Sequence, residues 1–272
     1  MFIVKVPGIN GLGKTKGCER AGNAILKSLE EIYSNESGKP IDVKLLDLEE
    51  IHLDNTNLEL TNQLIYKNGF EIFEEKPKVV FLGGDHSVSY SLTHAFLDFC
   101  ENNAKEPCLI VFDSHADCMP VTKGAENYPN HEEWLRAIIE KGFPKGNILL
   151  VGARNLDKEE IEFLSRNRIK TISINSFMED INNACETIME FSSGKELYVS
   201  IDIDVIDCAF APATGYPEPG GLTSRQFLYL IQRMNKIKNL KAVDIVEINP
   251  DKDKEYNMIT IKLGAKILSE LL

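Results

Sequence analysis

Short apolar runs rich in β-branched residues recur along the chain, and longer stretches with a helical pattern separate them. Several of these runs are apolar throughout, which is typical of strands buried on both faces. The alternation predicts an α/β fold in three layers, with a mostly parallel sheet between helices on both of its faces. We expect strands at Phe2 to Val6, Val79 to Leu82, Leu109 to Phe112, Ile148 to Val151, Thr171 to Ile174, Leu197 to Ile203 and Ala242 to Ile248.

Length and composition are those of an ordinary globular protein. The 272 residues are 43% hydrophobic and 26% charged, which is enough material for one large α/β domain with a substantial core. The chain has no internal repeat and no linker-like segment. We therefore expect residues 1–272 to form a single domain.

The charge balance limits the partners. A formal net charge of -12 argues against nucleic acids and anionic membranes, because their phosphates demand a basic face, and it suits a cationic small molecule. No apolar run approaches the roughly 20 residues that span a bilayer. The six cysteines include no C-x-x-C pair and the start of the chain does not resemble a secretory signal, so we expect reduced thiols and a cytoplasmic location.

Three polar motifs follow apolar runs, at Gly83 to His86, Asp113 to Asp117 and Asp202 to Asp204. In extended backbone the alternate Asp, His and Asp of the second motif would point to one side, at steps of roughly 6.6 to 7 Å. Ligands in open α/β sheets gather at the carboxyl ends of the strands. Carboxylates this crowded would repel unless protonated or neutralised, and two divalent ions about 3.5 to 4 Å apart would neutralise them. The pattern predicts a two-metal hydrolytic site.

An irregular stretch from Cys118 to Tyr128 precedes a further candidate residue. Asn130 and Glu133 have the spacing of a capping box, followed by an apolar helical pattern that begins at Trp134. His131 would then lie in the first turn of a helix. There the positive end of the macrodipole would lower its pKa.

Together these motifs resemble those of the ureohydrolase family of arginases and agmatinases. The most specific signature runs from Ser200 to Asp207 and continues through Ala211 to Gly215 and Pro219 to Thr223. The resemblance covers nearly the whole chain, as far as the segment Asp244 to Pro250 near its end. It implies an arginase-like fold and a homo-oligomer, commonly a trimer or hexamer.

The resemblance also implies two bound metal ions, usually Mn²⁺. Mixed carboxylate and imidazole ligation suits Mn²⁺, although other divalent first-row ions remain open. The ligands it implies are His86, Asp113, Asp117 and Asp202 for one ion and Asp113, His115, Asp202 and Asp204 for the other, so that Asp113 and Asp202 bridge.

The reaction implied by the resemblance is the hydrolysis of a cationic guanidino compound. Hydroxide, formed because two cations lower the pKa of water, attacks the guanidinium carbon, and urea and an amine are released. Glu247 matches the family glutamate that receives the guanidinium, and a carboxylate in an otherwise apolar strand would be costly to bury without such a partner. His131 matches the histidine that moves protons near the leaving amine. Asp207 is expected to support the ligand loop.

Several departures from the family pattern bear on the substrate. Met119 stands where arginases carry an asparagine that contacts the amino-acid end of arginine, which favours agmatine. Asp157, however, matches an arginase aspartate that contacts the α-amino group, so arginine and other guanidino acids remain alternatives. Tyr216 replaces a threonine and would narrow the pocket. Cys208 replaces a proline, and we expect it and Cys118 to be inert thiols rather than redox-active groups.

Two functions of other classes are alternatives to this one. The segment Gly8 to Thr15 fits the phosphate-binding P-loop pattern after an apolar strand, which suggests a nucleotidase. Gly17 weakens the helix start that a P-loop needs, and a nucleotidase leaves the three polar motifs unexplained. A metal-bound scaffold without catalysis is the other alternative.

Overall fold

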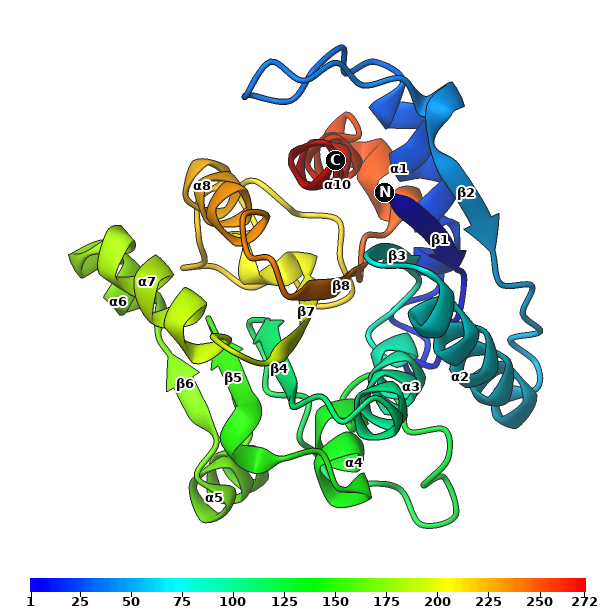
Figure 1. Cartoon of the computed structure of the whole chain (residues 1–272), viewed down its shortest axis with the longest axis vertical. Helices are drawn as coiled ribbons and strands as arrows, with labels where there is room; N and C mark the ends of the chain where they lie inside the picture. Colours follow the sequence, from blue (N-terminus) through cyan, green and yellow to red (C-terminus); the bar gives the residue numbers. More distant parts are fainter.

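The computed structural model describes residues 1–272 and contains one eight-stranded sheet in which every pair of neighbouring strands is parallel (Figure 1). The strand order is β2-β1-β3-β8-β7-β4-β5-β6. The strands are β1 (Phe2–Val6), β2 (Asp47–Glu50), β3 (Val79–Gly83), β4 (Pro107–Phe112), β5 (Ile148–Val151), β6 (Lys170–Ile172), β7 (Glu196–Asp202) and β8 (Leu240–Val246).

Helices cover both faces of this sheet and enclose two separate cores (Figure 1). Successive strand residues enter different cores: Val80 belongs to one and Phe81 to the other. None of the helices has both the length and the apolar character needed to cross a membrane. One layer contains α2 (Leu58–Glu75), α3 (Val88–Asn102), α4 (Trp134–Lys141) and α5 (Lys158–Asn167), and the other contains α1 (Ala21–Leu29), α6 (Ile174–Glu179), α7 (Ile181–Phe191), α8 (Ser224–Met234) and α10 (Ile259–Leu271).

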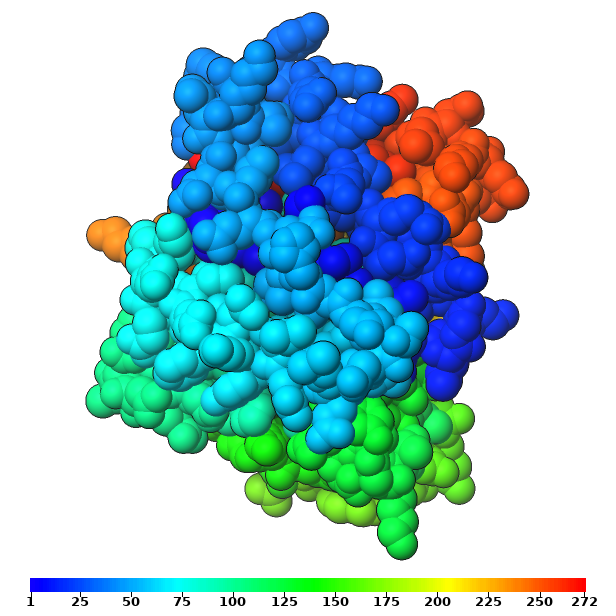
Figure 2. Space-filling model, turned by 90° about the vertical axis from the view of Figure 1, so that its right-hand side faces the viewer, coloured from blue at the N-terminus to red at the C-terminus, as the bar shows by residue number.

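Short helical segments complete the structure. Figure 2 looks onto the side of the molecule where the first part of the chain, blue to cyan, covers most of the surface. All six cysteines are free. The short segments are α9 (Pro250–Asp253) and the 3₁₀ turns η1 (Cys18–Arg20), η2 (Val43–Leu45), η3 (Lys145–Asn147), η4 (Ile203–Val205) and η5 (Lys254–Tyr256).

The predicted three-layer α/β fold is confirmed, with differences at particular strands. The predicted strand Thr171 to Ile174 ends at Ile172, because Ser173 is the N-cap residue of α6. The final strand lies two residues earlier than expected. The edge strand β2 was not predicted. Its sequence is DLEE and its side chains are mostly exposed, so this segment lacks the apolar pattern of a buried strand.

The sheet brings the polar motifs together. Strands β3, β8, β7 and β4 are neighbours at the centre of the sheet, and each is followed by one of the predicted functional segments. Because all strands are parallel, their carboxyl ends lie at the same edge. The predicted site therefore forms at one end of the sheet.

Candidate metal centre

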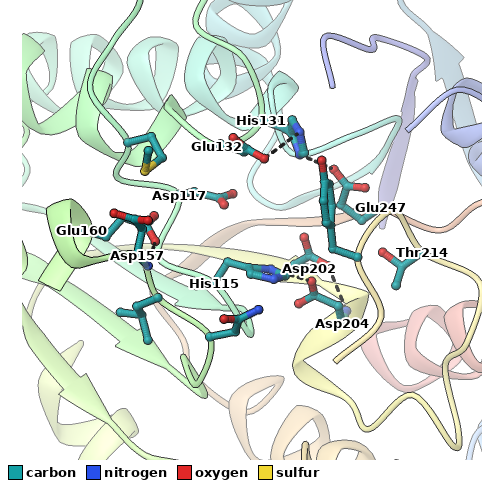
Figure 3. Close-up of a pocket in the computed structure, with 14 residues that line it drawn as sticks. His115, Asp117, His131, Glu132, Asp157, Glu160, Asp202, Asp204, Thr214 and Glu247 are labelled. Carbon is teal, nitrogen blue, oxygen red and sulfur yellow. Dashed lines mark hydrogen bonds and ion pairs between the residues drawn. The ribbon is translucent and has the colours of Figure 1, made fainter. Parts of the chain in front are cut away.

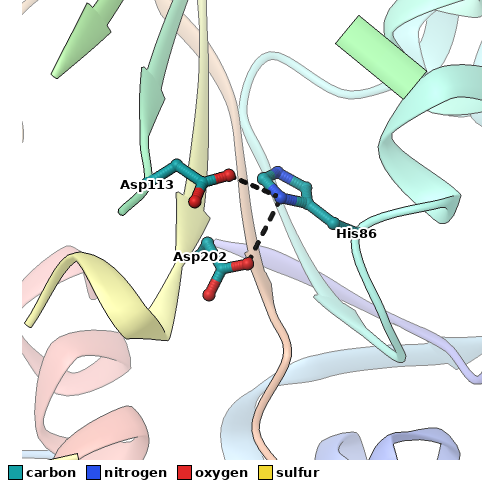
Figure 4. A group of neighbouring side chains, drawn as sticks. All are labelled: His86, Asp113 and Asp202. Atoms are coloured by element: carbon teal, nitrogen blue, oxygen red, sulfur yellow. Dashed lines mark ion pairs between the residues drawn. The ribbon is translucent and has the colours of Figure 1, made fainter. Parts of the chain in front are cut away.

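His86 lies on the loop after β3, and its ring points toward three carboxylates from two other strands. Figure 4 shows two of them, Asp113 and Asp202. The Nδ1 atom of His86 lies 3.1 Å from Asp113 Oδ2, 3.0 Å from Asp117 Oδ2 and 3.3 Å from Asp202 Oδ2. The other ring nitrogen, Nε2, lies 2.9 Å from Ser200 Oγ. Nδ1 is therefore the nitrogen free to bind a cation.

A second group of side chains shares Asp113 with the first. His115 Nδ1 lies 3.0 Å from Asp204 Oδ2 and 3.5 Å from Asp113 Oδ1. Potential ligand atoms of Asp113, His115 and Asp204 lie within 4.8 Å of one another, and the same holds for His86, Asp113 and Asp202. The structure thus brings all of the predicted metal ligands into one place.

The predicted reason for this convergence is wrong. Asp113 to Asp117 is a loop rather than an extended strand, since β4 ends one residue earlier and Asp117 has a φ of 50°. Hydrogen bonds within the motifs set the directions instead. The backbone N–H of His115 donates to Asp113 Oδ1 at 2.6 Å, and the N–H of Asp204 donates to Asp202 Oδ1 at 2.9 Å.

The buried carboxylates of the cluster need additional positive charge nearby to remain ionised. Burial raises the pKa of Asp202, and the charges of Asp204 and Asp113 raise it further. Burial and Asp113 raise the pKa of Asp117 to about 7. His86 Nδ1 and Asp113 Oδ2 are buried without a hydrogen bond. A divalent cation would satisfy both atoms and favour the ionised carboxylates, so this donor set fits a metal.

Glu247 follows β8 and connects the candidate metal ligands with the pocket above them. Its Oε1 atom accepts a hydrogen bond from the backbone N–H of His86 at 3.0 Å and lies 3.6 Å from His131 Nδ1. Burial raises the pKa of Glu247, and the charges of Asp202 and Asp85 raise it further. A carboxylate in this position is suited to a cationic ligand with several N–H donors.

The predicted helical environment of His131 is not observed. Asn130 N donates a hydrogen bond to Glu133 Oε2 at 3.1 Å, and Glu132 N donates to Asn130 Oδ1 at 2.9 Å. These bonds stabilise a turn, but α4 begins only at Trp134. The pKa of His131 is lowered, as predicted, but the cause is burial rather than a helix macrodipole.

Members of both clusters line a pocket of about 370 Å³: Asp117 and Asp202 of the first, and His115 and Asp204 of the second (Figure 3). Met119 and Tyr216, both predicted to contact substrate, line it together with His115 and His131. The Tyr216 ring stacks on His131, with ring centroids 5.5 Å apart, and meets His115 edge-on at 6.0 Å. Tyr216 therefore lines the pocket in contact with both histidines.

Asp157 also lines this pocket, where it serves as a helix cap. Its side chain accepts a hydrogen bond from Glu159 N at 2.9 Å. The carboxylate of Glu160 accepts two hydrogen bonds of 2.9 Å, at Oε2 from Asp157 N and at Oε1 from Cys118 N. Sequence reasoning missed Glu160, although the Asp-x-x-Glu spacing of a capping box was a usable signal. The other missed lining residues are Glu132, Asn155, Leu156 and Thr214.

Neighbouring polar residues hold the ligand loops in place. Asp207 accepts hydrogen bonds from Ala209 N at 2.8 Å and Gly220 N at 2.6 Å, which is the supporting role expected of it. Arg154 Nη2 donates to the backbone oxygen of Asp204 at 2.8 Å. These contacts fix the segment after β7 without adding a ligand.

The segment Gly8 to Thr15 does not have the geometry of a P-loop. No helix starts within it, and α1 begins only at Ala21. The N–H of Asn10 and the hydroxyl of Thr15 both donate to Asp85 Oδ2 at 2.7 Å. The loop thus encloses a buried carboxylate where a P-loop would enclose phosphate.

Comparisons with known proteins agree with this geometry. The sequence model of the Arginase family matches residues 1–272, and the chain belongs to that family. It is 31% identical over 201 residues to "Arginase 1, mitochondrial" of Oryza sativa subsp. indica, covering 74% of this chain and 56% of that protein. The chain thus spans about half the length of such plant arginases.

Other relatives cover the chain more fully. The N(1)-aminopropylagmatine ureohydrolase of Thermus thermophilus is 26% identical over 266 residues, covering 97% of this chain and 87% of that protein. The crystal structure of a hypothetical agmatinase from Burkholderia thailandensis superposes with a TM-score of 0.81 at 25% identity, covering 99% of this chain and 84% of that one.

Proposed function

We propose that residues 1–272 form one catalytic domain that hydrolyses a linear guanidino compound to urea and an amine. The observation that carries this proposal is the pair of histidine and aspartate clusters that share Asp113, with Glu247 beside them at the same pocket. Family membership supports it. The family resemblance also supports assembly as a trimer or hexamer, which sedimentation would measure.

Two divalent ions, for which we propose Mn²⁺, would be held by the two clusters. Bound there, they would supply a water-derived nucleophile at neutral pH. The proposed ligands are His86, Asp113, Asp117 and Asp202 for one ion and Asp113, His115, Asp202 and Asp204 for the other.

Glu247 and His131 are the proposed groups that act on the substrate. The guanidinium fork donates to the Glu247 carboxylate, whose ionised form it stabilises. Water adds oxygen to the guanidino carbon, the bond from that carbon to the amine nitrogen breaks, and this nitrogen takes up a proton. His131 lies close to Glu247 and can carry that proton. Its lowered pKa keeps it neutral and able to accept a proton at pH 7.

The charges of the pocket favour agmatine over arginine. Besides the proposed metal ligands Asp117, Asp202 and Asp204, its lining contains four carboxylates and neither lysine nor arginine. Agmatine carries a cation at each end and no carboxylate, so this field attracts it, whereas the carboxylate of arginine would be repelled. Met119 offers that carboxylate no hydrogen bond. Glu132, Asp157 and Glu160 line the same pocket and are the proposed partners of the distal ammonium.

Urea release from the Mn²⁺-loaded protein tests the proposal. Agmatine, aminopropylagmatine, arginine and guanidino acids would be assayed beside a nucleoside triphosphate, with bound metal measured on the same sample. We expect urea from agmatine or its aminopropyl derivative. Preferred cleavage of arginine would refute the preference for agmatine but would still support the proposed reaction. Phosphate release alone would support a nucleotidase, and bound metal without turnover would support a scaffold.

A further inference from the structure

Trp134 is the only tryptophan of the chain and lies buried at the first residue of α4. It touches two of the proposed metal ligands. The indole Nε1–H donates to Asp117 Oδ2 at 2.8 Å, and the indole ring lies 4.6 Å from the His86 ring, centroid to centroid. Trp134 does not line the pocket, so these contacts are directed at the ligands and not at a substrate.

The same turn of α4 also holds the backbone of Asp117. The Asp117 carbonyl accepts hydrogen bonds from Leu135 N at 3.1 Å and Arg136 N at 3.4 Å. The first N–H groups of a helix have no partner within the helix, so this carbonyl satisfies two of them. Asp117 has a φ of 50°, which is uncommon for a residue other than glycine and persists where surrounding contacts enforce it. Both the backbone and the carboxylate of Asp117 are thus fixed by one helical turn.

We propose that Trp134 is a positioning residue that holds Asp117 and His86 in the arrangement that binds a divalent ion. The proposal rests on the metal centre proposed above. Without the indole N–H, repulsion from Asp113 would favour a rotamer that turns the Asp117 carboxylate away from the cluster. Loss of the indole N–H should weaken the binding of one ion only, because Asp117 lies beside His86 and is not part of the group of Asp113, His115 and Asp204.

A simple core-filling role makes a different prediction. Phe143 is a large aromatic residue, also buried and in the same core as Trp134, and its side chain has no polar contact with the ligands. If Trp134 only filled space, then Phe143→Leu and Trp134→Phe would affect the metal centre in the same way, through stability alone. Phe143→Leu is therefore the matched control.

The decisive variant is Trp134→Phe, which keeps an aromatic ring beside His86 but removes the N–H donor. Metal-free protein would be titrated with Mn²⁺ in competition with a chromophoric chelator. We expect one of the two ions to bind about 10- to 100-fold more weakly, as is typical when a hydrogen-bond partner of a metal ligand is removed. The affinity for the other ion should be unchanged. Phe143→Leu should lower the unfolding temperature and leave both affinities as they are.

The wild-type chain provides a second measurement, in case Trp134→Phe does not fold. Its fluorescence comes from a single indole in contact with the ligand set, so added Mn²⁺ should change the emission as the His86 cluster fills. A constant emission during metal binding would overturn the proposal. Unchanged affinities in Trp134→Phe, equal loss of both ions, or equal loss in Phe143→Leu would overturn it as well. If the wild type binds no divalent ion, the metal centre itself is refuted along with it.

Discussion

The backbone N–H of His86 donates a hydrogen bond of 3.0 Å to the Oε1 atom of Glu247. One bond thus joins the residue proposed to bind an ion with the residue proposed to bind the guanidinium. It forms between the loops that follow β3 and β8, which are neighbours in the sheet. Glu247 adopts a φ of 65°, a left-handed conformation that surrounding contacts must enforce. A substitution of Glu247 therefore has to spare this bond if its effect on substrate binding is to be isolated.

Glu247→Gln meets that requirement. The amide oxygen can still accept from His86 N, but the charge that attracts a guanidinium is gone. We expect kcat/KM to fall at least about 30-fold, since loss of one partner from a buried charge pair costs roughly 2 to 5 kcal/mol, while metal content stays at the wild-type level. Kinetics and metal analysis on the same preparation check both parts. Loss of metal together with activity would show that Glu247 acts mainly through His86.

Asp204→Asn should release one of the two ions and remove nearly all urea production. The amide keeps the shape of the side chain but not the charge that an ion requires. Asp207→Asn is the matched control, because Asp207 is on the same segment and its contacts are to backbone N–H groups. It should lose stability but keep both ions. Equal metal content in Asp204→Asn and the wild type would contradict the ligand assignment.

Met119→Asn should shift the preference toward arginine. An asparagine at this position of the pocket wall gives a substrate carboxylate a hydrogen-bond donor that Met119 lacks. We expect the ratio of kcat/KM for agmatine to that for arginine to fall at least about tenfold, which corresponds to roughly 1.4 kcal/mol. Met178→Asn, an exchange at an exposed methionine of α6, should leave the ratio unchanged. A ratio that stays constant in Met119→Asn would remove Met119 from the determinants of specificity.

The buried imidazole of His131 should make the protein less stable in acid. Its pKa is lowered by burial, so between that value and about 6.5 the unfolded chain binds the proton and the folded chain does not. Stability from this group is therefore present above about pH 6.5 and is lost as the pH falls toward the folded pKa. His131→Gln cannot take up the proton, so its unfolding temperature should drop less between pH 7 and pH 5.

Thermal unfolding of both proteins, each in excess chelator, measures this difference. Heat is preferable to chemical denaturants here because guanidinium and urea resemble the proposed substrate and product. An identical drop in the two proteins would mean that His131 titrates normally.

The sequence was most informative where local chemistry determines the outcome. Strands such as β4 were predictable because they are buried on both faces and apolar throughout, whereas the polar edge strand β2 carries no such pattern. The candidate metal ligands were identified from three short motifs and the family resemblance, and the structure brings them together. The surroundings of His131 were not, because its burial depends on residues far away in the chain. The contacts of Trp134 with Asp117 and of Glu160 with Cys118 likewise join separate segments. The spacing of residues in the sequence does not predict such contacts.

Every proposed ligand and pocket residue lies at or beyond the last residue of a strand, or in a loop or helix terminus, while the two cores lie on either side of the sheet. Substitutions of the residues that line the pocket can therefore change the site without disturbing the two cores of the fold. Proteins named as an arginase, an N(1)-aminopropylagmatine ureohydrolase and a hypothetical agmatinase are all similar to this chain. Identity averaged over the whole chain is consequently a poor guide to what a member of the family cleaves. The few positions around the pocket, read one at a time, are the better guide.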